Sequence, residues 1–326
     1  MNKRLIAEFE KQSFTQIIFP HKNTDWVNYL DEAKKCFINI INEIIKYQRC
    51  LVVCADVEEV KQYFDKNTNL SFVEYETDDT WARDCSAICV QDGKNIKLLD
   101  FTFTGWGGKF EAKKDDAMTA FLTPQAIKCD FILEGGGVES NGIDTILTTS
   151  KCMLNKNRNA NLTKDEITKK LNHYFGATKI LYLNHGYLKG DDTDSHIDTL
   201  ARFIDKRTIM YVKSLDKEDE HYIELQLMED ELKFYAKEYN LKLIALPMSD
   251  AIYFEDERLP ATYANFLFVN GAVLVPTYGI KQDEEVLQIF EKIFLDRIVV
   301  KIDCSTLIRQ HGSLHCVTMN IMKNYV

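Results

Sequence analysis

The sequence predicts an α/β fold built from repeated β-β-α-β units. Short apolar runs typical of strands alternate with segments of helical periodicity along the 326 residues. Pairs of strands recur with one helix between them, and the dipeptides Asp92-Gly93 and Asn270-Gly271 mark two hairpin turns. A circular arrangement of such units is compatible with this order, although the similarity between units is too faint to establish a repeat.

The predicted elements follow one another closely. Up to residue 150 they are helix 26–48, strand 49–55, helix 57–64, strand 70–76, hairpin 87–103 and strand 142–149. Beyond it they are helix 163–176, strands 179–184 and 207–212, helix 221–240, strand 242–247, hairpin 264–279, helix 283–294 and strand 297–304. No Pro-, Gly- or Ser-rich linker separates them, so we expect a single domain over residues 1–326.

Composition and charge exclude several classes of function. The 40 basic and 50 acidic residues give a net charge of −10, which argues against a nucleic-acid partner because phosphate binding requires a basic patch. The first 20 residues lack an apolar signal-type segment, and no uncharged apolar run reaches the ~18 residues of a membrane helix. We therefore expect a cytoplasmic protein that binds neither nucleic acid nor membrane. The nine scattered cysteines favour buried thiols over a disulfide framework.

Four polar, glycine-containing segments interrupt the apolar pattern and are the candidate functional loops. They are 78–85, 132–142, 191–203 and 309–316. Most of them precede or follow a predicted strand, where binding and catalytic residues tend to lie.

The third of these loops carries side chains of metal-ligating type. They are Asp192, Asp194, His196 and Asp198. The loop fails the calcium-binding EF-hand template, because Ile197 stands where glycine is required, and the His-Glu-x-x-His zinc motif is absent. We therefore expect no metal ion at the site, and no organic cofactor.

Separate loops each contribute a carboxylate, which suggests an acidic pocket. Asp84, Glu134 and Asp198 come from three different loops, and a planar guanidinium pairs well with carboxylates because its N–H donors match their geometry. Trp81 lies close to Asp84 in the sequence and is suited to stack on such a cation. The alternative for Trp81 is ordinary core packing.

Cys316 is the candidate nucleophile. A thiolate is strongly nucleophilic once its pKa is lowered, and a bound guanidinium would lower it. His196 and Asp198 alternate on a segment that we expect to be extended, so both side chains would point to one face. His315 would point away from Cys316 if the two lay in a strand, which makes His196 the better general acid and base.

The ordered motifs resemble the agmatine deiminase family. The stretches "TWARD", "EGGG", "SHID", "YANFLFVNGAVLVPTYG" and "GSLHC" occur in the order of that family, and "FTGWGGKF" and "LTTSKCMLNKNRN" are similar to it as well. The similarity spans nearly the whole chain. It implies the fold of the guanidino-group-modifying superfamily, a five-bladed α/β propeller (pentein) with pseudo-fivefold symmetry.

The resemblance also implies roles for individual residues. Cys316 would be the nucleophile and His196 the general acid and base, while Asp84 and Asp198 would hold the guanidinium nitrogens. Glu134 would support or orient the histidine.

Three further residues are implied on the substrate side. Trp81 would border the substrate channel, Asn265 would face the site, and Gly312 would contact the substrate. Gly312 is all that remains of a glycine run that usually precedes the nucleophile in the family, since "RQHGSL" stands there in this chain. A second departure is "SNG" at 140–142, where the family usually has an aspartate.

The function implied is hydrolysis of agmatine to N-carbamoylputrescine and ammonia through a covalent cysteine thiouronium, in putrescine and polyamine biosynthesis. The partner would be a small cationic guanidino compound. Members of the family tend to form homo-oligomers, so the resemblance also implies a homodimer. Alternatives remain open: a peptidylarginine deiminase, an amidinotransferase that uses the same intermediate, and a catalytically silent homologue that binds polyamines. The altered loop before Cys316 leaves the substrate less certain than the chemistry.

Overall fold

The computed structural model describes residues 3–322, so residues 1–2 and 323–326 of the expected domain lie outside the described part of the chain. Five sheets of three or four strands are present within residues 3–322, together with one two-stranded hairpin. In each of the five, an antiparallel strand pair is followed by a parallel pair. A helix connects the parallel strands, which confirms the predicted β-β-α-β pattern.

The first two sheets contain the N-terminal third of the chain. In spatial order, one consists of β19 (Thr318–Met322), β2 (Gln12–Ile18), β3 (Arg49–Cys54) and β4 (Leu70–Glu74). The other consists of β1 (Arg4–Leu5), β5 (Ile88–Asp92), β6 (Asn95–Thr102) and β7 (Ile127–Ile132). Their helical segments are η1 (Asp25–Tyr29), α1 (Leu30–Ile44), α2 (Val57–Lys61), α3 (Ala82–Cys85), α4 (Gly105–Gly108) and α5 (Lys113–Leu122).

The remaining sheets follow in chain order. Their strands are β8 (Glu139–Ser140), β9 (Thr145–Thr149) and β10 (Lys179–Leu183), then β11 (Ala201–Phe203), β12 (Thr208–Lys213) and β13 (Lys242–Pro247), then β16 (Leu267–Val269), β17 (Ala272–Thr277) and β18 (Ile298–Asp303). The small hairpin is β14 (Tyr253–Phe254) with β15 (Glu257–Arg258). The helical segments are η2 (Gly135–Gly137), α6 (Ser150–Met153), α7 (Lys164–Phe175), η3 (Ile197–Thr199), α8 (Tyr222–Tyr239), α9 (Gln282–Ile293) and η4 (Leu307–Gln310).

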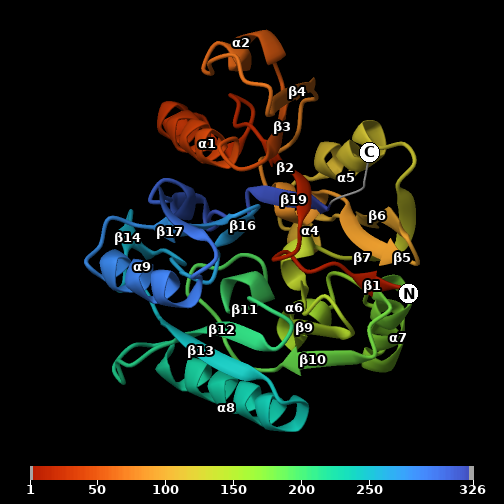
Figure 1. The fold of residues 1–326 in the computed structure, drawn as a ribbon, viewed down its shortest axis with the longest axis vertical. Coiled ribbons are helices and arrows are strands. Elements are labelled where there is room, and N and C mark those ends of the chain that lie inside the picture. Colours follow the sequence, from red (N-terminus) through yellow and green to blue (C-terminus); the bar gives the residue numbers. More distant parts are fainter. Residues whose placement is uncertain (1–2, 323–326) are drawn as a thin grey trace.

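The long helices cover the outer faces of the sheets. Figure 1 shows α1, α8 and α9 at the periphery of the molecule, with the strands inside them. Helix α1 illustrates why: its buried residues are apolar and recur at spacings of three and four, namely Ala33, Cys36, Phe37, Ile40, Ile41 and Ile44. In place of the predicted helix 26–48, the chain forms the 3₁₀ segment η1 followed by α1, and predicted helix 57–64 shortens to Val57–Lys61.

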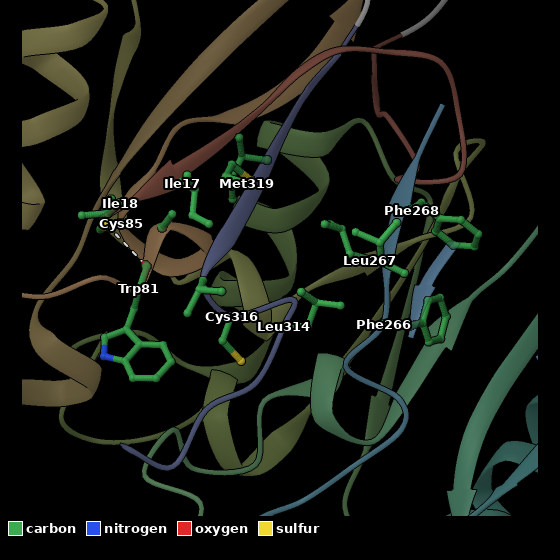
Figure 2. Packing of buried hydrophobic residues seen from close by; sticks show 14 of the residues in the cluster. Ile17, Ile18, Trp81, Cys85, Phe266, Leu267, Phe268, Leu314, Cys316 and Met319 are labelled. Carbon is green, nitrogen blue, oxygen red and sulfur yellow. Dashed lines mark hydrogen bonds between the residues drawn. The ribbon is translucent and has the colours of Figure 1, made fainter. Parts of the chain in front are cut away.

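The last described strand pairs with a strand from the N-terminal part of the chain. Strand β19 pairs antiparallel with β2, with Thr318 opposite Ile17. Ile17, Ile18, Met319 and Leu314 pack there in a core that extends to Phe266 and Phe268 (Figure 2). This pairing fixes the segment that carries Cys316, because β19 begins two residues after it.

No helix within residues 3–322 is both long and apolar enough to cross a lipid bilayer. All nine cysteines are buried and free, as the sequence predicts.

Candidate active site

Short helical turns rather than long elements hold the candidate residues. Asp84 lies in α3, His196 directly precedes η3, and Asp198 lies within it. Cys316 lies in the turn that leads to β19, and its carbonyl oxygen accepts a hydrogen bond of 3.1 Å from the backbone N–H of Arg83. The expectation of an extended segment at 196–198 is therefore wrong: the chain makes a 3₁₀ turn there, and tertiary packing brings both side chains to the site.

Three of the predicted side chains converge on Gly136. A Cβ added at Gly136 would stand 2.7 Å from Nδ1 of His196, 3.0 Å from Oδ1 of Asp84 and 3.1 Å from Oδ2 of Asp198. The first distance is shorter than carbon and nitrogen tolerate, so only glycine lets these groups approach one another. The glycines after Glu134 thus have a packing role at the centre of the site.

Asp84 is held by two hydrogen bonds. The backbone N–H of Gly136 donates to Oδ1 and the indole N–H of Trp106 donates to Oδ2, each over 2.9 Å. Trp106 reaches this position with a left-handed backbone (φ 55°), which is uncommon for a residue with a side chain. Burial raises the pKa of Asp84 above its usual value, although His196 and Trp106 both oppose the increase.

Asp198 is arranged differently. Its Oδ2 lies 2.7 Å from Nδ1 of His315, whereas its buried Oδ1 has no hydrogen-bond partner within residues 3–322. Burial alone would raise the pKa of Asp198, but His315 and His196 outweigh it, so the pKa lies below its usual value. Asp198 is therefore an ionised carboxylate with one oxygen unoccupied.

His196 lies between two carboxylates. Its Nδ1 is 3.7 Å from Oδ1 of Asp84, and its Nε2 is 3.8 Å from Oε2 of Glu134. Burial would lower the pKa of His196, but Asp84, Cys152 and Glu134 reverse the effect, and its pKa lies well above the ordinary value. The neighbouring acids thus favour the charged form of the ring, whose Nδ1 faces Asp84 and whose Nε2 faces Glu134, both beyond hydrogen-bond distance.

Arg158 anchors Glu134 from the other side. Its Nε donates to both carboxylate oxygens of Glu134, over 2.9 and 2.8 Å, and its Nη1 donates to Asp194 over 2.8 Å. Glu134, Cys152 and His196 offer ligand atoms within 4.8 Å of one another. Because Arg158 already engages both oxygens of Glu134 with a positive charge, we assign no metal to this cluster.

Cys316 lies beside these groups. Burial, Asp198 and Asp84 together raise the pKa of its thiol well above the ordinary value, because negative neighbours disfavour a thiolate. Its Sγ is 3.4 Å from Oδ1 of Asn265, and the same oxygen accepts the backbone N–H of His315 over 2.8 Å. Figure 2 shows the side chains of Cys316 and Trp81 in the same region, beyond the lower end of the ribbon of β19.

A cavity of about 170 Å³ opens over Cys316 and Asp84. Trp81, Trp106 and Gly312 are among its lining residues. It is strongly acidic: its aspartates are Asp25, Asp79, Asp84, Asp191 and Asp192. Neither lysine nor arginine is among its lining residues, and Asn265 contacts Cys316 from outside the lining.

Sequence reasoning overlooked several residues of the site. Trp106 and Arg158 lie within "FTGWGGKF" and "LTTSKCMLNKNRN", which are recognisable as motifs in the sequence. The sequence did not indicate that these two residues contact Asp84 and Glu134. Asp79 lies within the candidate loop 78–85 but was not singled out, and Asp25 lies outside all four candidate loops. His311 lines the cavity in place of a family glycine, with φ 63° and its Nδ1 2.6 Å from the carbonyl oxygen of Gly190.

Comparison with known proteins agrees with this geometry. The sequence model of the Porphyromonas-type peptidyl-arginine deiminases matches residues 4–321. A protein of Legionella pneumophila named as a candidate agmatine deiminase is 30% identical, with 98% of this chain and 95% of that protein covered.

Two solved structures are similar over almost their whole length. The substrate-bound serine-for-cysteine variant of the C. jejuni agmatine deiminase is 39% identical, with a TM-score of 0.94 and coverage of 98% of this chain and 96% of that one. A Porphyromonas gingivalis protein named as a candidate arginine deiminase is 43% identical, with a TM-score of 0.95 and full coverage of both chains.

The fold and the matches define the class first: the protein is an α/β enzyme of the hydrolases that act on linear amidines. Within that class, the chain belongs to the agmatine deiminase family, which the Porphyromonas-type peptidyl-arginine deiminase model describes.

Proposed function

We propose that the protein hydrolyses agmatine to N-carbamoylputrescine and ammonia, with Cys316 as nucleophile. The observation that carries this proposal is the convergence of Asp84, His196 and Asp198 around Gly136, next to Cys316. We further propose that residues 1–326 form a single catalytic domain, a five-bladed propeller in which each of the five β-β-α-β sheets is one blade. The setting would be putrescine and polyamine synthesis in the cytoplasm, with the protein as a homodimer.

Substrate binding would also activate the nucleophile. The vacant Oδ1 of Asp198 is suited to accept N–H groups of a guanidinium, and the ionised form of Asp84 would accept others. The bound cation offsets the negative charges that raise the pKa of Cys316, so the thiol releases its proton to solvent and the thiolate forms next to its target carbon. In the absence of a cation the thiol stays neutral.

His196 would move the protons. The Cys316 thiolate adds to the guanidinium carbon, and His196 donates a proton to one –NH₂ group, which departs as ammonia and leaves a thiouronium. The neutral imidazole then takes a proton from water as the oxygen adds to the same carbon. The C–S bond breaks, Cys316 departs as the thiolate, the remaining hydroxyl proton passes to solvent and the neutral urea product leaves. Glu134, fixed by Arg158, stabilises the charged ring at Nε2.

The cavity favours agmatine over arginine compounds. Its acidic lining suits a substrate that is positive at both ends, whereas the carboxylate of arginine would find no lysine or arginine among the lining residues. Arg309, the conceivable partner for a peptide carboxylate, instead pairs with Glu32 over 2.7 Å and stacks on the rings of Tyr29 and Phe254. It is not among the lining residues of the cavity.

The test is ammonia release from agmatine, free arginine and a peptide with C-terminal arginine, measured side by side. We expect release from agmatine, its loss in Cys316→Ala, and retained agmatine binding by that variant. Release mainly from the peptide would favour the peptidylarginine alternative. Consumption of agmatine without ammonia in the presence of an acceptor amine would indicate an amidinotransferase, and binding without turnover a silent homologue.

A further inference from the structure

We propose that His315 is a positioning residue, a buried imidazolium that joins the substrate-binding Asp198 to Glu8. The inference rests on the proposed function only in that Asp198 is taken to bind the guanidinium. His315 precedes the nucleophile by one residue, but it lies on the other side of the turn and does not line the cavity over Cys316.

Both ring nitrogens of His315 face carboxylates. Nδ1 lies 2.7 Å from Oδ2 of Asp198, and Nε2 lies 2.5 Å from Oε2 of Glu8. Ionised carboxylates only accept hydrogen bonds, so both ring nitrogens must carry hydrogens, and the ring is the cation. The side chain is only 3% exposed, so these two carboxylates are its main polar contacts.

The charge balance around His315 leads to the same protonation state. Six buried ionisable groups form one connected network: the acids Glu8, Glu139 and Asp198, and the bases Arg83, Arg202 and His315. Of the three acids, Glu8 and Asp198 have pKa values below their ordinary values, whereas burial raises the pKa of Glu139. The charged form of the ring is therefore favoured by the two carboxylates that contact it.

The contacts of the network place Glu8 at its centre. Oε2 of Glu8 lies 2.9 Å from Nη2 of Arg202 and 3.4 Å from Nη2 of Arg83, and Arg202 continues to Glu139 over 2.6 Å. Oε1 of Glu8 accepts the backbone N–H of Phe268 over 2.9 Å. Glu8, which belongs to the N-terminal segment, thereby fixes Nε2 of the His315 ring.

The contact between Nδ1 of His315 and Asp198 determines which oxygen of Asp198 is available to the substrate. Because Oδ2 of Asp198 is committed to His315, Oδ1 is left as the oxygen without a partner within residues 3–322. The adjacent cation also keeps Asp198 ionised before substrate arrives. His315 and Cys316 share Asn265, whose Oδ1 accepts both of their backbone N–H groups, over 2.8 and 3.3 Å. Substrate anchor and nucleophile are therefore held by the same few side chains.

Removing the positive charge of the His315 ring should raise the pKa of Asp198. The charged groups in direct contact with the His315 ring are Asp198 and Glu8, and its carbonyl oxygen accepts Nε of Arg83 over 3.4 Å. Without the positive ring the pKa of Asp198 rises, and the carboxylate that binds guanidinium is lost at a higher pH. The acidic limb of the kcat/KM profile, which is the pH range in which kcat/KM falls as the solution is acidified, therefore moves to higher pH.

Two variants separate the charge of the ring from its hydrogen bond. His315→Asn retains a donor near the position of Nδ1, whereas His315→Gln places its donor near Nε2. We expect the acidic limb of kcat/KM for agmatine to rise by about one pH unit in both. KM should rise roughly tenfold in His315→Gln and less in His315→Asn, with kcat changed less than KM. The matched control is His221→Gln, another buried histidine with a carboxylate partner, Asp219 at 2.6 Å, which should leave the profile unchanged.

Two measurements keep the inference distinct from the proposed function. Calorimetric binding of agmatine to Cys316→Ala, with and without His315→Gln, should show roughly tenfold weaker binding in the double variant, and it needs no turnover. NMR of the otherwise unmodified chain labelled with ¹⁵N-histidine should show His315 doubly protonated at pH 7. A neutral His315 ring, or an unchanged acidic limb with unchanged agmatine affinity, would overturn the inference. Failure of agmatine binding in Cys316→Ala itself would instead contradict the proposed function.

Discussion

The benzo ring of Trp81 lies directly against the backbone of Gly312. A Cβ added at Gly312 would stand 2.1 Å from Cζ3 and 2.6 Å from Cη2 of the indole. Both residues line the cavity over Cys316, so their contact sets part of its shape. Gly312 is therefore a position of "RQHGSL" at which a side chain would meet the indole.

Gly312→Ala should therefore displace the Trp81 indole. We expect kcat/KM for agmatine to fall by about 10- to 100-fold, the usual consequence of moving a group that positions substrate. The measurement is steady-state ammonia release. In a Trp81→Phe background the same glycine change should cost much less, because phenylalanine lacks the second ring that carries the clashing atoms. Equal losses in both backgrounds would contradict the proposed contact.

Trp106→Phe should shift the pH dependence of the reaction. The lost indole N–H stabilises the ionised form of Asp84, so the pKa of Asp84, already raised by burial, should rise further. Since the ionised form binds guanidinium, activity should be lost at a higher pH as the solution is acidified, and kcat/KM at pH 7 should fall about tenfold. Phe110→Leu is the control, because Phe110 contacts the Trp106 ring and lines the cavity without bonding Asp84. An unshifted acidic limb in Trp106→Phe would count against this role of Trp106.

Asp84→Asn should make Cys316 more reactive while it abolishes turnover. Asp84 is one of the negative neighbours that raise the pKa of Cys316, so its neutralisation lowers that pKa and enlarges the thiolate fraction at neutral pH. Each pKa unit corresponds to about a tenfold rise in alkylation rate by iodoacetamide well below the pKa. Peptide mass spectrometry would identify Cys316 among the nine cysteines. Asp192→Asn, at the same cavity, should leave the rate unchanged, and slower alkylation in Asp84→Asn would refute the electrostatic account.

Arg158→Leu should destabilise the fold. The change removes from Glu134, which is 1% exposed, the only cation that is hydrogen-bonded to it within residues 3–322, and breaking such a buried pair lowers the free energy of unfolding by about 3–5 kcal/mol. Chemical denaturation measures this loss. The double variant Arg158→Leu/Glu134→Leu should recover most of it. Lys61→Ala, which breaks an exposed pair with Glu58, should change the free energy of unfolding by less than about 1 kcal/mol.

Local patterns account for the elements that the sequence predicted well. Helix α7 has its capping box at Thr163 and Glu166 and ends at Gly176, where φ is 62°. The turn between β16 and β17 falls at Asn270-Gly271, as expected for that dipeptide. In both cases the determining interactions are formed by neighbours in the sequence.

The elements that were overlooked depend on distant partners. Strands β2 and β19 belong to one sheet although nearly the whole chain separates them. Helix α5 has no clear apolar stripe, and only Asp115, Met118 and Thr119 are buried in it. Such elements are specified by what packs against them, and a local pattern does not contain that information.

In the candidate site, too, the residues could be identified from the sequence, whereas their local conformation and distant contacts could not. Residue type and motif identified Asp84, His196, Asp198 and Cys316, and the structure brings them together. Reasoning from strand alternation was wrong at His196, where the chain makes a 3₁₀ turn. The alternation assumed for His315 and Cys316 fails as well, because 314–317 form a turn, and the partners of His315 were not foreseen.

The pairing of β19 with β2 has a consequence during protein synthesis. A ribosome delivers residues 12–18 early, but their antiparallel neighbour, Thr318–Met322, emerges only after the four other sheets have been made. Cys316 and His315 arrive with that last strand. The emerging chain must therefore keep one edge of β2 unsatisfied for most of translation, and a ribosome that stalls before residue 318 would release an inert polypeptide with that edge exposed to aggregation.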